Sequence, residues 1–109
     1  MLTLPIKKKW FDMIFSGGKK EEYRKLSEYY ATRFRKLFND DNGKMAVSKK
    51  QLIAFRNGYA SSSPYFVALC SCREDFGNPE WGAEPGEKYF VLTIHEIINP
   101  DALNDLQLK

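Results

Sequence analysis

The order of the first three elements is decided by residues 2–25, which read LTLPIKKKWFDMIFSGGKKEEYRK. The apolar opening predicts a strand over Leu2–Ile6, and the helical spacing of Ile6, Trp10, Met13 and Ile14 predicts a helix over Lys7–Phe15. Gly17 and Gly18 stand where the end of a helix requires a positive φ. The segment Glu21–Leu26 alternates between two faces, which predicts a second strand.

The rest of the chain predicts one more helix and three strands. Ser27 is a good N-cap for a helix over Glu28–Phe38. The predicted strands are Gln51–Arg56, which the two-residue turn signal Asn57-Gly58 ends, Tyr65–Cys72 and Lys88–Ile98. A loop is predicted over Arg73–Glu87 and a terminal helical turn over Pro100–Leu106. This order favours the α+β class, with a mainly antiparallel sheet that curls into a small β-barrel.

Length and composition limit the class of protein. A chain of 109 residues suits one domain over 1–109. Its composition, with 43% hydrophobic and 15% aromatic residues, excludes a disordered chain. No apolar run approaches the roughly 18 residues of a membrane span. The opening segment, followed by three lysines, lacks the apolar stretch of a signal peptide. We therefore expect a soluble cytoplasmic domain with no membrane partner.

Charge is distributed unevenly along the chain. Residues 1–56 contain fourteen basic and six acidic side chains, whereas residues 57–109 contain three basic and eight acidic ones. Such asymmetry is typical of a basic face that attracts a polyanion, of which nucleic acid is the commonest. The alternative is that the two halves neutralise each other across the fold.

The cysteines and the single histidine exclude one kind of metal site. Cys70 and Cys72 form a lone C-x-C inside an apolar strand, and His95 is the only histidine. A four-ligand zinc site cannot be assembled from Cys and His in this set, and no other metal or cofactor is indicated. We expect both thiols to be buried and reduced, as is usual in the cytosol.

The sequence around the helix–strand junction carries a G-x-K-x-x-E-x-R pattern over residues 17–24. In a strand, Glu22 and Arg24 lie side by side, roughly 6.6 Å apart along the backbone, and Lys19 precedes them at the mouth of the strand. In a cleft, such a cluster can hold a phosphate or a base edge through Arg24, or lower the pKa of Lys19 enough to make it a general base. The alternative is a partly exposed surface ion pair.

Three segments together resemble the ASCH domain family of the PUA-like superfamily. They are the G-x-K-x-x-E-x-R pattern, Leu4-Pro5-Ile6-Lys7 before it, and Trp81-Gly82 with Lys88-Tyr89-Phe90-Val91-Leu92-Thr93-Ile94 after it. The resemblance covers a core of about residues 2–98 and leaves a short extension over 99–109. It implies a PUA-like β-barrel flanked by helices, with a charged cleft beside the first helix.

The resemblance also implies a function, namely binding of RNA or a nucleoside-like ligand. Some members of the family are amidohydrolases that act on acetylated cytidine, and some are ribonucleases. Lys19 and Arg24 match the lysine and arginine of the motif, and Glu22 matches its acidic position. The amidohydrolase branch has a threonine where this chain has Glu22, and its distant glutamate has no assigned counterpart here, which puts that chemistry in doubt.

Other residues are candidates for ligand contacts. Lys7, Lys8 and Lys9 open the first helix, where cations oppose the helix dipole, so a phosphate-facing role competes with simple solvation. Arg56 either lines the cleft or ends a strand. Trp81 either stacks on a base or pins its own loop, and His95 has either a chemical or a structural role.

Two functional hypotheses follow, together with a third, simpler one. The first is an RNA- or nucleotide-binding module built around Lys19, Glu22 and Arg24. The second is a metal-independent amidohydrolase or ribonuclease in which Lys19 is the base, Glu22 orients it and Arg24 holds negative charge. The third is a protein-interaction domain that uses the acidic loop Glu74–Glu87. The identity of the ligand and the oligomeric state stay open.

Overall fold

The computed structural model describes residues 1–98 as one five-stranded sheet with two α-helices and a short 3₁₀-helix. No helix among these residues is both long enough and apolar enough to cross a membrane. The elements in chain order are β1 (Leu2–Ile6), α1 (Lys8–Ser16), β2 (Glu21–Lys25), α2 (Glu28–Phe38), β3 (Gln51–Asn57), β4 (Tyr65–Phe76), η1 (Pro79–Trp81) and β5 (Lys88–Ile98).

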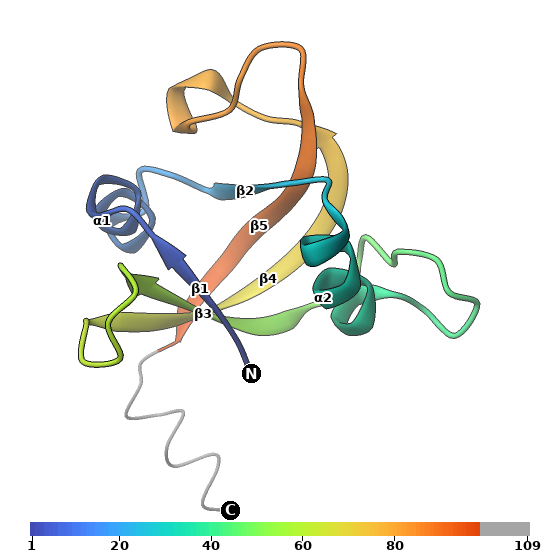
Figure 1. Ribbon diagram of the computed structural model, residues 1–109, viewed down its shortest axis with the longest axis horizontal. Coiled ribbons are helices and arrows are strands. Elements are labelled where there is room, and N and C mark those ends of the chain that lie inside the picture. The colour runs from blue at the N-terminus through green and yellow to red at the C-terminus, as the bar shows by residue number, and fades with distance from the viewer. Residues whose placement is uncertain (99–109) are drawn as a thin grey trace, which may run out of the picture.

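The strands follow the order β1-β3-β4-β5-β2, so β1 and β2 are the two edges of the sheet. Only the pairing of β1 with β3 is parallel, and the other three pairings are antiparallel. The sheet curls into a half-barrel, and β2 runs between α1 and α2 across its open side (Figure 1). The predicted α+β class and mainly antiparallel sheet are confirmed, and the barrel stays open between β1 and β2.

The carboxyl end of α1 and the amino end of α2 form as the sequence predicts. Ser27 is the N-cap of α2, and its Oγ accepts a hydrogen bond from the Tyr30 amide at 3.3 Å. Gly17, at φ 88°, is the left-handed C-cap of α1, and its N–H donates to the carbonyl of Ile14. The Lys19 amide then donates to the carbonyl of Met13, which fixes where β2 starts.

Two sequence predictions about the strands are wrong. The loop predicted over Arg73–Glu87 begins later, because residues 73–76 continue β4 and pair with the start of β5. The loop is therefore residues 77–87, and it contains η1. The two-residue turn at Asn57-Gly58 is not formed either: the Asn57 amide donates to the carbonyl of Pro64, so residues 58–64 make a longer connection. The helical turn predicted over Pro100–Leu106 and the extension 99–109 lie outside the described residues.

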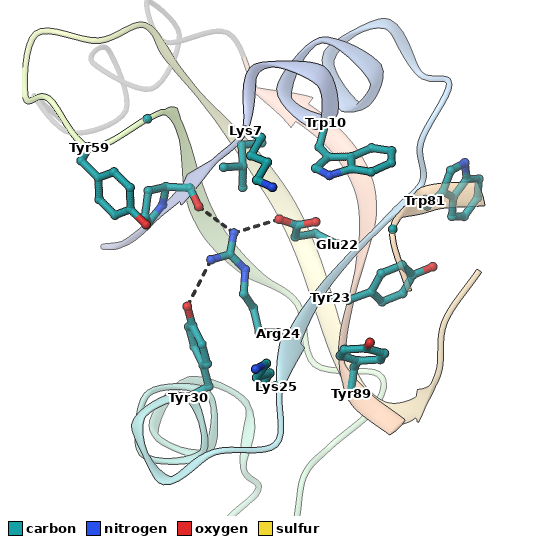
Figure 2. Close-up of a pocket in the computed structure, with 14 residues that line it drawn as sticks. Lys7, Trp10, Glu22, Tyr23, Arg24, Lys25, Tyr30, Tyr59, Trp81 and Tyr89 are labelled. Carbon is teal, nitrogen blue, oxygen red and sulfur yellow. Dashed lines mark hydrogen bonds and ion pairs between the residues drawn. The ribbon is translucent and has the colours of Figure 1, made fainter. Parts of the chain in front are cut away.

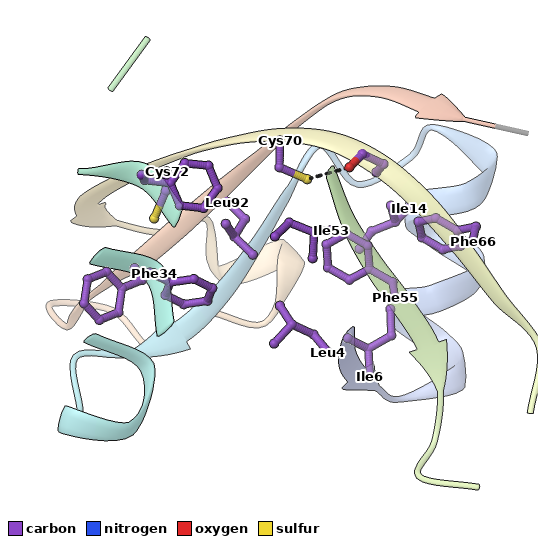
Figure 3. Packing of buried hydrophobic residues seen from close by; sticks show 13 residues of the cluster. Leu4, Ile6, Ile14, Phe34, Ile53, Phe55, Phe66, Cys70, Cys72 and Leu92 are labelled. Atoms are coloured by element: carbon purple, nitrogen blue, oxygen red, sulfur yellow. Dashed lines mark hydrogen bonds between the residues drawn. The ribbon is translucent and has the colours of Figure 1, made fainter. Parts of the chain in front are cut away.

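The main core lies between the curled sheet and the two helices (Figure 3). Phenylalanines from α2, β3, β4 and β5 dominate it, and each is almost fully buried: Phe34, Phe38, Phe55, Phe66 and Phe90. Cys70 and Cys72 belong to the same cluster as free thiols, as predicted. Burial raises the pKa of each thiol to about 12, which keeps both protonated and chemically inert.

Of the seven glycines, Gly77 leaves the least room for a side chain. A Cβ on Gly77 would lie 2.6 Å from the Cβ of Ala83 and 2.7 Å from Cε1 of Tyr23. The Tyr23 ring is fixed, because its hydroxyl donates to Glu21 and accepts from the Asn78 amide. The loop that carries η1 therefore packs on β2 through a contact that only glycine allows.

We expect Gly77→Ala to destabilise the protein by about 1–3 kcal/mol, because the added methyl group forces either Ala83 or Tyr23 to move. Urea denaturation measures the free energy of unfolding. Gly18→Ala is the matched control: its Cβ would be 3.7 Å from the nearest atom, so a change within about 0.5 kcal/mol is expected. Equal effects of the two substitutions would contradict the tight packing at Gly77.

Candidate functional site

The open side of the half-barrel contains a cavity of about 640 Å³. This volume lies within the roughly 300–1,000 Å³ of small-molecule binding sites. Its walls come from β1, the start of α1, β2, the first turn of α2, the connection after β3, the loop around η1 and the start of β5 (Figure 2). The lining residues are Pro5, Ile6, Lys7, Trp10, Glu22, Tyr23, Arg24, Lys25, Tyr30, Gly58, Tyr59, Trp81, Gly82 and Tyr89.

The three charged residues of the sequence motif contact one another, and two of them, Glu22 and Arg24, line this cavity. Glu22 is buried, and its two carboxylate oxygens bind different cations: Oε1 lies 3.3 Å from Nζ of Lys19, and Oε2 lies 2.8 Å from Nη2 of Arg24. Glu22 and Arg24 lie on the same face of β2, as the alternation predicts, and both line the cavity. We call this trio the charge chain.

Lys19 occupies one end of the charge chain and is 1% exposed. Its ammonium donates to the carbonyl of Trp81 at 2.5 Å and lies over the rings of Trp10 and Tyr23, 4.7 Å and 4.9 Å from their centroids. Burial lowers the pKa of Lys19, and the Glu22 carboxylate offsets part of that shift. Lys19 therefore lies behind the wall of the cavity, not at its mouth.

Arg24 occupies the other end and spans the gap between the edge strands. One guanidinium nitrogen, Nη2, donates to Glu22 and also to the carbonyl of Pro5 in β1, at 2.8 Å each. The second, Nη1, donates to the hydroxyl of Tyr30 in α2 at 3.2 Å (Figure 2). A single side chain thus links β2 to β1 and to α2, in the place where a closed barrel would have a ladder of backbone bonds.

Aromatic rings make most of the remaining wall. They come from six separate segments and are Trp10, Tyr23, Tyr30, Tyr59, Trp81 and Tyr89. Tyr59 is 92% exposed although it lines the cavity, so it contributes little to the core. Its position is fixed by the neighbouring Gly58, whose amide donates to the carbonyl of Ile6 at the end of β1.

The other predicted contacts divide into those near the cavity and those away from it. Lys7 and Trp81 line it. Lys8 and Lys9 are exposed beside it: Lys8 pairs with Asp12 at 2.6 Å, and the Lys9 ammonium lies 4.6 Å from the Trp10 ring. Arg56 is not a lining residue, because its guanidinium donates to the carbonyls of Ala60 and Ser61 and holds the connection after β3.

His95 belongs to a different part of the surface. It is exposed, and its Nε2 lies 2.7 Å from the hydroxyl of Ser71 on the neighbouring strand. It also lines a smaller hollow of about 230 Å³ with Glu96 and the end of α1. His95 and the charge chain are therefore at separate sites, except that Lys19 also reaches the wall of the smaller hollow.

Within residues 1–98, no group of three or more His, Cys, Asp or Glu side chains could hold a metal ion. Comparison with models of protein families, with curated proteins and with solved structures finds no match for this chain.

We expect Glu22→Gln to destabilise the protein at neutral pH by about 3 kcal/mol or more, because it leaves a buried ammonium without its counter-charge. Urea denaturation at several pH values measures this loss. Glu21→Gln is the matched control: Glu21 pairs with the partly exposed Arg73, and a loss of about 1 kcal/mol or less is expected.

The pH dependence gives a second measurement on the same variant. The pKa of Lys19 is lower in the folded than in the unfolded chain, so the unfolded chain binds more protons between the two pKa values, and stability rises with pH there. Glu22 raises the pKa of Lys19, so Glu22→Gln is expected to extend this rise toward lower pH. A pH profile parallel to that of the wild-type protein would contradict the Lys19–Glu22 coupling.

Proposed function

We propose that this chain is an ASCH-like domain with a PUA-like fold, and that it binds RNA or a nucleotide in the cavity between β1 and β2. The observation that supports this most strongly is the combination of six aromatic rings with three cations, Lys7, Arg24 and Lys25, around one cavity. A base offers two π faces and its phosphate carries negative charge, so a nucleotide complements both features.

Burial and charge around the cavity support an anionic ligand. Among residues 1–98, Glu22 is the only acidic residue that lines it, and both of its carboxylate oxygens bind cations, so it adds little negative potential. Lys7 and Lys25 are exposed at the cavity, and Lys8 and Lys9 are exposed next to it. The ammonium groups of Lys7 and Lys25 at the cavity, with that of Lys9 over the lining Trp10 ring, attract a phosphate before any base contact forms.

We expect a labelled single-stranded RNA of about ten nucleotides to bind the protein, with an affinity that falls as salt increases. If three to five phosphates are neutralised, the log–log slope is roughly −2 to −4, at about −0.7 for each phosphate. Fluorescence anisotropy at several salt concentrations measures both quantities. An affinity that does not change with ionic strength would overturn the proposal.

We expect Tyr59→Ala to weaken binding of this RNA about tenfold, because it removes one stacking surface from the wall of the cavity. The melting temperature should stay unchanged, since Tyr59 is almost fully exposed. Phe76→Ala is the matched control, because Phe76 is an exposed aromatic residue at the end of β4 that does not line the cavity. Equal affinities for both variants would place the ligand elsewhere.

A second candidate function is metal-independent hydrolysis, and the observation that favours it is the buried amine of Lys19 with its lowered pKa, 3.3 Å from Glu22. In that reaction neutral Lys19 takes a proton from water and the hydroxide attacks the acetyl carbonyl of acetylated cytidine. The acyl C–N bond then breaks as the protonated lysine returns its proton to the leaving amine, which releases cytidine and acetic acid, and the latter ionises to acetate. Ribonuclease activity would use the same amine as the base. We favour binding, because the Lys19 ammonium donates to Trp81 and Glu22 behind the wall of the cavity.

Purified protein incubated with acetylated cytidine and with labelled RNA, each in the presence of a chelator, distinguishes these functions. We expect binding without turnover. Turnover that Lys19→Met abolishes would establish the hydrolase instead. Turnover that Lys19→Met leaves unchanged would remove Lys19 from the chemistry and indicate a contaminating enzyme.

A further inference from the structure

A line of side chains, two tyrosine rings with an arginine at each end, leads from the cavity onto the surface of α2. The guanidinium carbon of Arg24 lies 5.7 Å from the ring centroid of Tyr30, which lines the cavity. The Tyr30 ring meets that of Tyr29 edge to face, with centroids 5.0 Å apart. The guanidinium carbon of Arg33 then lies 3.4 Å from the Tyr29 centroid. We call the last pair, Tyr29 and Arg33, the outer stack.

The outer stack is not needed for the core. Tyr29 is 58% exposed, whereas the buried side of α2 is made by Phe34 and Phe38. Arg33 is held in place because its Nη1 donates to the backbone carbonyl of Tyr29 at 2.9 Å. The guanidinium therefore lies on the tyrosine ring before any ligand arrives, as a flat, partly exposed cationic group.

We propose that the ligand is a single strand of RNA rather than a free nucleotide: one nucleotide enters the cavity, and the next base stacks on the outer stack. This inference rests on the proposed function. Aromatic rings interleaved with cations are the surfaces on which successive bases of single strands stack. Tyr29 and Tyr30 are in direct ring contact, so a base at the rim of the cavity has the second surface next to it.

The charges around this path suit the backbone that would join the two bases. Lys25 lines the cavity next to the start of α2, and it is exposed. Arg33 carries its charge at the far end of the path, and Lys36 is exposed one turn further along the helix. A free mononucleotide bound in the cavity would leave the outer stack without a partner.

The experiment compares RNA hexanucleotides of A, C and U, a length within the roughly 4–16 nucleotides of single-strand sites, with the matching nucleoside monophosphates. Calorimetry measures both affinities for each variant. We expect the best hexanucleotide to bind the wild-type protein about tenfold or more tighter than its monophosphate. Tyr29→Ala should remove about tenfold from hexanucleotide affinity and leave monophosphate affinity within about twofold.

Two further variants test whether stacking on the planar group of Arg33 matters beyond its charge, and whether loss of any exposed tyrosine has the same effect. Arg33→Lys keeps the charge but not the planar group, so it should weaken the hexanucleotide in the same selective way. Tyr65→Ala is the matched control. Tyr65 is also an exposed tyrosine, and its ring centroid lies 5.5 Å from the guanidinium carbon of Arg56. It does not line the cavity. Its affinities should equal those of the wild-type protein.

The outcomes distinguish failure of this inference from failure of the proposed function. Hexanucleotides that bind no tighter than monophosphates, or a Tyr29→Ala variant that weakens both ligands equally, would overturn the inference and leave nucleotide binding standing. Failure of the wild-type protein to bind either ligand would overturn the proposed function and this inference with it. Selective loss of hexanucleotide affinity in Tyr29→Ala and Arg33→Lys supports both.

Discussion

The buried carboxylate of Glu22, shared between two cations, is the interaction on which the rest of the structure depends. Each cation of the charge chain also binds a backbone carbonyl, Lys19 that of Trp81 and Arg24 that of Pro5. The chain therefore connects the η1 loop, β2 and β1 across the open side of the half-barrel. Burying three charges is costly unless every one is paired, which explains why so many polar bonds converge there. The cavity exists because side chains, and not a backbone ladder, join the two edge strands.

Much of the fold could be predicted from the sequence, because its signals are local. The apolar spacing of α1, the Ser27 cap of α2 and the alternation in β2 act over a few residues, and the structure has all three. The end of β4 is not predicted because Arg73, Glu74 and Asp75 are polar and not buried, and Arg73 bonds to Glu21, Thr93 and Asp75. Such a strand looks like a loop when the partners on other strands are unknown.

The candidate site was predictable only in part, for the same reason. Glu22 and Arg24 lie on one strand, so alternation alone brings them together. The burial of Lys19 depends on the loop of residues 77–87, which folds back to place the Trp81 carbonyl on its ammonium. Tyr59 reaches the cavity because β1 and β3 pair in parallel and Gly58 bonds to Ile6. Parallel pairing has no signature in either strand, although a tyrosine directly after Asn57-Gly58 was a hint of an exposed aromatic contact.

The strand order also has a consequence for how the molecule assembles. The two walls of the cavity, β1 and β2, are close in sequence, yet the ladder of β2 is made with β5, where Glu21 pairs with Thr93. During synthesis β5 is the last of the five described strands to leave the ribosome, so β2 has no ladder partner until β5 has emerged. Pairings between such distant segments slow folding, because the chain loses entropy before the contacts repay it. The cavity between β1 and β2 is therefore complete only after β5 has been made, long after both of its edge strands.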